Sequence, residues 1–271
     1  MPLPSGIHAL GTPFIELQSI DSTNNYALTQ IHANMAQPGT CYFAHEQTSG
    51  KGQRGKTWAT EPGMNIILSI VLKPNFLQPL QQFQLSACVA VATRDFFSKY
   101  DNDSFRIKWP NDLYWRDRKL GGILIENIIK SHEPVRKGSP KESSRTFGGG
   151  ANWDWAVAGI GMNINQANFG AELKNPVSLK QITGKSFDQI KLAKELCTSL
   201  DHFYKKLMND KANAILEMYN QYLYKKDELV KLKKDNRIFS GMIRKVTAMG
   251  QLVVQHSVEE QFDFGEIEWL I

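Results

Sequence analysis

The chain has few cysteines, and they are not placed for a shared structural role. Cys41, Cys88 and Cys197 stand far apart among apolar neighbours, and no two of them are separated by two residues. An odd number without that spacing predicts neither a disulfide framework nor a zinc site. The sequence also lacks a basic then apolar N-terminal segment and any apolar run near ~20 residues, so we expect neither a signal peptide nor a membrane span. A reducing cytoplasm fits these absences.

A strong charge of one sign is also missing. The 271 residues include 32 Lys and Arg against 27 Asp and Glu, and the net charge of +5 is spread along the chain. Spread charge is typical of a solvated surface, so the composition disfavours a nucleic-acid-binding protein. With 42% hydrophobic residues the chain can bury a large core, and its length predicts one main domain and a small one. We expect these domains at residues 1–230 and 231–271.

The run Lys-Trp-Pro-Asn-Asp at residues 108–112 is the most informative part of the sequence. Proline lacks a backbone donor and favours an extended residue before it, so a strand that begins at Phe105 should end here. Asn111 and Asp112 then lie at the tip of this strand, and a second strand at 113–115 runs back from it. The motif therefore places a lysine, an amide and a carboxylate on one rigid strand–turn–strand unit.

A third strand, at residues 120–126, follows a charged turn and contains two adjacent glycines. Because side chains alternate along a strand, Lys119, Gly121 and Ile123 are predicted to share one face. Adjacent glycines weaken a strand, and they usually indicate that another backbone or a ligand comes close. A lysine beside this bare surface predicts an anion site.

The segment at residues 47–58 combines glycines with cationic side chains. Glycines at 50, 52 and 55 alternate with Lys51, Arg54 and Lys56. A phosphate could order such a flexible loop through its backbone N–H groups and its charges. The glycine spacing is neither that of a Walker loop nor that of a dinucleotide fingerprint. Taken alone, the segment is equally well explained as a solvated basic turn.

The remaining sequence predicts further helices and strands. Apolar periodicity and capping residues predict strands at 14–20, 39–46, 64–73 and 155–165, and helices at 26–34, 80–100, 186–208 and 212–226. Ser186 and Gln189 form the expected capping box of the third helix. Four short strands, at 242–246, 252–255, 262–264 and 267–270, predict a small C-terminal β-barrel. Residues 131–150 are polar and rich in helix-breaking residues, which is typical of a mobile loop between two strands.

Five motifs occur in a fixed order along the chain. Asp-Ser-Thr-Asn, Gly-Lys-Gly-Gln-Arg-Gly-Lys-x-Trp, Lys-Trp-Pro-Asn-Asp, Lys-Leu-Gly-Gly-Ile-Leu-Ile-Glu and Gly-Ile-Gly-Met-Asn-Ile-Asn begin at residues 21, 50, 108, 119 and 159. Over nearly the whole chain this arrangement resembles the biotin protein ligases, also called biotin–acetyl-CoA-carboxylase ligases. The resemblance implies an α+β fold of the class II synthetase-like biotin/lipoyl ligase type, with a mixed, mostly antiparallel sheet, packed helices and the small C-terminal β-barrel.

The resemblance also implies a two-step reaction. The carboxylate of biotin attacks the α-phosphate of ATP and releases pyrophosphate, and a lysine of a biotin carboxyl carrier domain then attacks the biotinyl-5′-AMP. Negative charge develops on phosphate oxygens in the first step, so cations and donors are needed. Lys119 is the expected central cation, Lys108 and Asn111 would support the phosphate, and Asp112 would orient the carrier lysine. Mg²⁺ is expected on the ATP phosphates, because no carboxylate cluster predicts a protein-held metal.

The other expected site residues follow from the same resemblance. Hydroxyl and amide side chains suit the neutral urea of biotin, and the expected biotin-binding residues are Ser22, Thr23, Asn24, Gln47, Gly50, Lys51, Lys119 and Gly122. The expected residues for ATP and the adenylate are Gln53, Arg54, Trp58, Asn111, Lys119, Gly161 and Asn163, with Trp58 stacked on adenine. Relatives usually have arginine where Gln53 stands. Either Arg54 compensates, or the glutamine holds the intermediate less tightly.

Two other functions stay open on the sequence. A lipoate or octanoate ligase would share the fold, although the position of Lys-Trp-Pro-Asn-Asp before Lys119 favours biotin. A non-catalytic, nucleic-acid-binding relative is suggested only by the pI near 9.0. Many bacterial relatives carry an N-terminal DNA-binding domain, and the twenty residues before Asp21 are too few for one. We therefore expect the ligase-only form, without DNA or membrane partners, and the resemblance is compatible with a homodimer.

Overall fold

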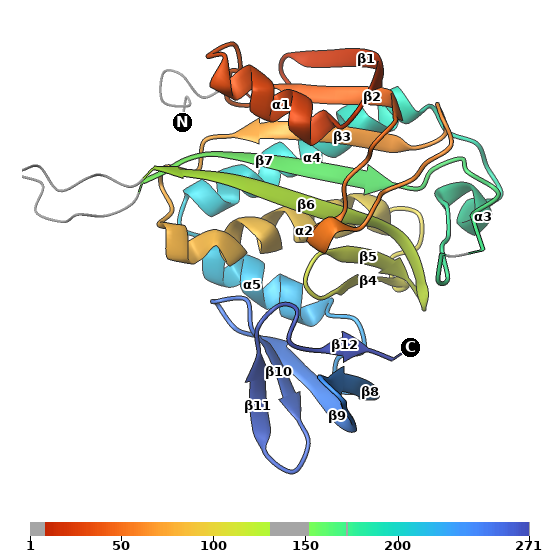
Figure 1. Cartoon of the computed structure of the whole chain (residues 1–271), viewed down its shortest axis with the longest axis vertical. Helices are drawn as coiled ribbons and strands as arrows, with labels where there is room; N and C mark the ends of the chain where they lie inside the picture. The colour runs from red at the N-terminus through yellow and green to blue at the C-terminus, as the bar shows by residue number, and fades with distance from the viewer. Residues whose placement is uncertain (1–8, 131–151, 172, 271) are drawn as a thin grey trace, which may run out of the picture.

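A seven-stranded mixed sheet forms the centre of the computed structural model, which describes residues 9–130, 152–171 and 173–270 (Figure 1). Its strands lie in the order β1-β2-β3-β7-β6-β5-β4. They are β1 (Phe14–Ile20), β2 (Cys41–Gln47), β3 (Ile66–Leu72), β4 (Phe105–Lys108), β5 (Asp112–Trp115), β6 (Arg118–Lys130) and β7 (Asn152–Met162). β1 and β2 pair in parallel, and the other neighbouring strands of this sheet pair antiparallel. The predicted α+β fold is confirmed.

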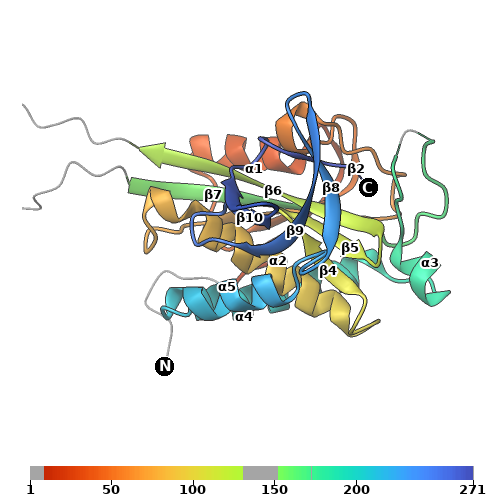
Figure 2. The same ribbon diagram turned by 90° about the horizontal axis from the view of Figure 1, so that it is seen from below.

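Helices cover both faces of the sheet because both faces are apolar. The helices are α1 (Thr23–His32), α2 (Gln82–Ser98), α3 (Leu179–Thr183), α4 (Gln189–Met208) and α5 (Ala212–Gln221), with short 3₁₀ turns at Gln53–Gly55 and Pro79–Gln81. Every residue of β3 is buried, and alternate residues point to opposite faces. Leu68 belongs to the main core with α2, α4 and α5, and Val71 packs under α1. Figure 2 shows α1 on one side of the sheet and α4 and α5 on the other.

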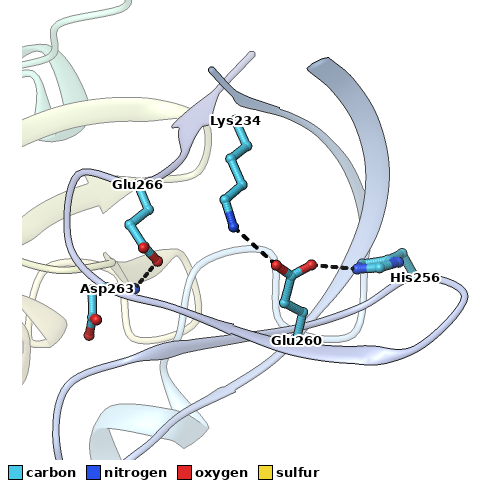
Figure 3. A network of polar contacts seen from close by, with 5 residues as sticks. All are labelled: Lys234, His256, Glu260, Asp263 and Glu266. Atoms are coloured by element: carbon cyan, nitrogen blue, oxygen red, sulfur yellow. Dashed lines mark hydrogen bonds and ion pairs between the residues drawn. The ribbon is translucent and has the colours of Figure 1, made fainter. Parts of the chain in front are cut away.

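The C-terminal residues form a second, smaller antiparallel sheet. Its order is β11-β10-β9-β8-β12. The strands are β8 (Leu229–Lys234), β9 (Arg237–Val246), β10 (Leu252–Gln255), β11 (Glu259–Phe262) and β12 (Glu268–Trp269). Lys234 of β8 forms an ion pair with Glu260 of β11 at 3.1 Å, and His256 lies 3.0 Å from the same carboxylate (Figure 3). These long side chains thus link two strands that are three positions apart in the order of the sheet.

Several boundaries differ from the sequence prediction for local reasons. The prediction of a capping box at Ser186 was wrong, because Asp188 caps α4 and accepts a hydrogen bond from Lys191 N–H over 2.9 Å. The described residues contain a capping box at Ser178, which starts α3, a helix that the periodicity did not predict. Another lies at Gln78, before the 3₁₀ turn at Pro79–Gln81. The C-terminal sheet has five strands, since β8 begins at Leu229. The predicted domain boundary after residue 230 falls within β8 and stays a prediction.

A β-bulge changes which residues share a face on β6. The pairing of β6 with β5 skips Leu120, and an extra residue of this kind interrupts the alternation of side chains. A Cβ atom added at Gly122 would consequently lie 3.6 Å from Lys119 Nζ. The prediction that Lys119 shares its face with Gly121 and Ile123 was therefore wrong, because the bulge places it on the side of Gly122.

Two further predictions concern whole segments. The polar segment at 131–150, predicted to be a mobile loop between two strands, lies outside the described residues. Among the helices that the structure describes, none is long and apolar enough to cross a membrane.

Candidate active site

Three glycines on the α1 side of the sheet leave room for side chains from other elements. Gly159 and Gly161 lie two residues apart on β7, and Gly122 of β6 pairs with Gly161. A Cβ atom at Gly159 would collide with the amide of Asn24, and one at Gly161 would lie 2.6 Å from the indole of Trp58. Strand geometry places these three positions within roughly 8 Å of one another. We call this bare surface the glycine strip.

Buried polar groups from four elements meet at one end of the glycine strip. Thr23 N–H donates to Gln47 Oε1 over 2.7 Å. Ser69 Oγ lies 2.7 Å from Thr23 Oγ1 and 2.6 Å from Asn24 Oδ1. Asn24 Nδ2 donates to the carboxylate of Glu126 over 2.7 Å. These contacts fix two amides and two hydroxyls on α1, β2 and β3, and we call them the polar cluster.

The polar cluster has both donors and acceptors left for a ligand. Ser69 has one proton, so it can donate to Thr23 or to Asn24 but not to both. The buried Ser22 hydroxyl caps α1 by accepting from a backbone N–H, and its own proton stays available. Gln47 Nε2 donates no hydrogen bond to the described residues. A neutral group that both donates and accepts, such as a urea or an amide, matches this set.

Cationic side chains gather at the other end of the glycine strip. Lys119 Nζ lies 2.7 Å from Asp112 Oδ1. Lys108 donates to the hydroxyl of Tyr114 over 3.3 Å. Its ammonium group also lies 4.9 Å from the ring centroid of Tyr114 and 5.6 Å from that of Trp269, on β12. Lys108 is thus enclosed by aromatic rings from the central sheet and the C-terminal sheet.

The electrostatics of this end favour an anion. Burial lowers the pKa of Lys108 to about 8, and Asp112 opposes this decrease while Lys119, Lys56 and Lys174 add to it. A buried ammonium with other cations nearby is costly unless an anion joins it. One carboxylate does not balance these lysines, so the site is built to accept negative charge.

The turn that presents Asp112 is held on several sides. The amide of Asn111 donates to the carbonyl of Ile123, and Ile123 N–H donates to Asn111 O over 3.0 Å. The hydroxyl of Tyr219 donates to Pro110 O over 2.9 Å. This turn is therefore rigid, and the side-chain amide of Asn111 is engaged by β6.

The segment at 47–58 begins at the polar cluster and ends at the glycine strip. Trp58 N–H donates to Gly50 O over 2.8 Å, and a Cβ atom at Gly50 would collide with the carbonyl oxygen of Trp58. Lys51 Nζ donates to Asn25 Oδ1 of α1 over 2.5 Å. The glycine therefore permits a tight crossing of the loop, which carries the indole of Trp58 onto Gly161.

Gln53 and Arg54, in the middle of this loop, differ in their contacts. Gln53 Oε1 is buried and has no hydrogen-bond partner among the described residues. Arg54 donates from Nη1 to Gly265 O over 3.2 Å, in the turn between β11 and β12. Its guanidinium is thus placed against the C-terminal sheet.

Asn163, another expected site residue, is held by its own hydrogen bonds. Asn163 is buried, its N–H donates to Leu120 O over 2.9 Å, and its side-chain amide donates to Val177 O over 3.2 Å. These hydrogen bonds hold the chain just after β7. Sequence reasoning did not single out Ser69 or Glu126. A serine within the otherwise apolar β3 was the available signal for the first of these.

No group of three His, Cys, Asp or Glu side chains in the described part of the chain is arranged to hold a metal ion.

Comparison with known proteins gives consistent matches. A family model described as the biotin/lipoate A/B protein ligase family matches residues 16–135. The bifunctional ligase/repressor BirA of Escherichia coli is 38% identical over 120 residues, which are 44% of this chain and 36% of that protein. BirA of Salmonella typhimurium is 27% identical over 254 residues, 93% of this chain and 72% of that protein. A biotin protein ligase structure from Aquifex aeolicus in complex with biotin and ATP has a TM-score of 0.73 at 22% identity, covering 94% of this chain and 97% of that one.

Proposed function

We propose that the chain, whose residues 16–135 match the model of the biotin/lipoate A/B protein ligase family, is a member of this family and an ATP-dependent biotin–protein ligase. In this proposal it activates biotin to biotinyl-5′-AMP with release of pyrophosphate. It then transfers the biotinyl group to a lysine of a biotin carboxyl carrier domain. Its relatives include proteins that carry the name of biotin ligases, and the Aquifex aeolicus structure contains biotin and ATP.

The observation that supports biotin is that the glycine strip has the polar cluster at one end and cationic side chains at the other. Biotin has a neutral ureido ring at one end and a carboxylate at the other. The polar cluster at Thr23, Gln47 and Ser69 offers donors and acceptors for a urea, and Lys119 lies at the opposite end. The dithiolane ring of lipoate would leave the remaining donors and acceptors of this cluster, such as Gln47 Nε2, without a partner in the ligand, which costs binding energy. The arrangement therefore favours biotin over lipoate within the same fold.

The cationic end suits attack of the carboxylate on a phosphate. Lys119 would hold the biotin carboxylate beside the α-phosphate, and Lys108 would stabilise the charge that develops on the phosphate oxygens. Aromatic rings enclose Lys108, so its charge acts through little water, whereas the side chain of Lys119 is 31% exposed. Mg²⁺ would accompany the phosphates of ATP, because the described residues provide no three-ligand metal site.

The second step would use the same end of the site. Asp112 Oδ1 lies 2.7 Å from Lys119 Nζ. Its carboxylate would orient the amine of an incoming carrier lysine toward the carbonyl carbon of the biotinyl–phosphate mixed anhydride, and AMP would leave as the amide bond forms. The partner in this proposal is therefore a carrier domain that presents one accessible lysine. Trp58, packed on Gly161, would bound the adenylate on the loop side.

Exchange of labelled pyrophosphate into ATP tests the first step without a carrier protein. We expect exchange with biotin and none with lipoate or octanoate. Ser69→Ala should reduce the biotin-dependent exchange, since it removes a buried hydroxyl from the polar cluster, whereas Ser86→Ala on the exposed side of α2 should not. Exchange that is faster with lipoate than with biotin would assign the chain to the lipoate branch, and a folded protein without exchange would exclude both.

A further inference from the structure

Arg54 contacts the C-terminal sheet at a place shaped to receive it. Its Nη1 donates to Gly265 O over 3.2 Å, and its guanidinium lies 5.8 Å from the ring centroid of Phe264. A Cβ atom at Gly265, whose φ is +93°, would lie 2.5 Å from Arg54 Nη1. Only glycine leaves this space open. Arg54 itself has φ +55°, a left-handed conformation that is uncommon for arginine and needs support from its surroundings.

The turn that receives Arg54 is held in place independently of the loop. Asp263 N–H donates to Glu266 Oε2 over 2.8 Å (Figure 3), and Glu266 N–H donates to Asp263 O over 3.1 Å. Phe264 packs edge-on against Trp109, with ring centroids 5.9 Å apart. Because Trp109 belongs to the same motif as Lys108, the turn is set at a fixed position relative to the cationic end of the site.

From these contacts we propose that Arg54 is a positioning residue that fastens the loop at 50–56 to the turn at 263–266. The C-terminal sheet thereby holds the loop over the glycine strip and slows the loss of a bound reaction intermediate. Arg54 acts through its neighbours in the loop and does not itself contact the adenylate. The part that concerns the intermediate rests on the proposed function, whereas the contact between loop and turn does not.

Proteolysis of the ligand-free protein tests the contact itself. Lys51 and Lys56 are exposed, so a lysine-specific endoproteinase reports opening of the loop without depending on Arg54. We expect Arg54→Gln to increase the cleavage rate at these lysines about three- to tenfold, the range for one exposed charged hydrogen bond with a ring contact. Gly265→Val should give a similar increase from the other side of the contact, and Arg237→Gln, on the exposed part of β9, should leave the rate unchanged.

The double variant separates a direct contact from two unrelated effects. If Arg54 and Gly265 act on each other, Arg54→Gln combined with Gly265→Val should cleave no faster than either single variant. The proposal would be overturned if the increases in cleavage rate of the two single variants multiplied in the double variant. It would also be overturned if either single variant were cleaved at the wild-type rate. Phe264→Ser provides a third route to the same opening if the valine variant does not fold.

Release of the intermediate tests the functional part. Arg54→Gln and Gly265→Val should each accelerate release of biotinyl-AMP from the enzyme by about the factor seen in proteolysis, and change its rate of formation less. Faster cleavage with unchanged release would refute the role in retention. A protein that forms no biotinyl-AMP would contradict the proposed function while leaving the proteolysis result intact.

Discussion

Replacement of Lys108 by methionine should stabilise the protein while impairing its reaction. Burial lowers the pKa of Lys108 from 10.5 to about 8, so its charge opposes folding at neutral pH by about 3 kcal/mol. Methionine has a similar length and no charge. The variant also loses the contacts of Lys108 with Tyr114, which offsets part of this stabilisation. A net increase of about 2 kcal/mol in the free energy of unfolding corresponds to a rise of roughly 4–8 °C in Tm for a chain of this size.

The sign of the pH dependence distinguishes this cause from better packing. Below about pH 8 the lysine is charged in both states, and the wild type bears the full cost of burial. Between about pH 8 and 10.5 the folded state has lost this proton and the unfolded state still binds it, so wild-type stability rises with pH relative to the variant. The difference between the two proteins should therefore be largest at pH 7 and nearly absent near pH 10.5.

Urea unfolding of both proteins at pH 7 and pH 9.5 measures this difference. Lys231→Met, at an exposed position of β8, is the matched control and should change stability little at either pH. A Lys108→Met variant that is no more stable than the wild type at pH 7, or whose gain does not shrink with pH, would refute the buried-charge interpretation. The same variant should form biotinyl-AMP at least tenfold more slowly, since a charged contact with the phosphate is lost.

Three further substitutions test separate parts of the site. Lys119→Ala should lower the rate of biotinyl-AMP formation by about 10²–10³ in a folded protein, and near-wild-type synthesis would remove Lys119 from the reaction. Gln53→Arg should slow release of biotinyl-AMP about fivefold, because a charged hydrogen bond replaces a neutral one; an unchanged rate in a filter assay would show that this position has no part in retention. Gly161→Ala should destabilise the protein by about 1–3 kcal/mol in thermal unfolding, since the new methyl group meets the indole of Trp58. Gly63→Ala is the control, because Gly63 has open space around it and φ +69°, so its substitution should lower stability only through backbone strain.

The order of motifs along the chain was enough to predict the main elements of the fold. Periodicity identified β3 and α4 because their apolar faces are continuous, and the proline at 110 marked the end of β4. The side of β6 on which Lys119 lies could not be predicted in this way. A bulge depends on the pairing of two strands, and the sequence of one strand does not encode it.

Contacts between distant segments account for the other differences. Glu126 was part of a recognised motif, yet its bond to Asn24 joins residues 102 positions apart, and no local pattern predicts such a partner. The resemblance to the biotin ligases led us to expect Arg54 among the residues for the adenylate, where it would compensate for Gln53. Its position against Gly265 depends on how the C-terminal sheet meets the central one, which periodicity does not determine.

The C-terminal sheet is better understood as one wall of the site than as an appendage. Trp269 lies 5.6 Å from the ammonium of Lys108, and Phe264 packs on Trp109 of the same motif. An ammonium at the edge of the central sheet alone would be hydrated, and its attraction for a phosphate would be screened. Enclosing it by aromatic rings removes water, which lowers the pKa of Lys108 and strengthens its interaction with any anion that enters. The destabilising burial of this lysine and its proposed role at the phosphate therefore have the same physical cause, so a variant without Trp269 should lose both together.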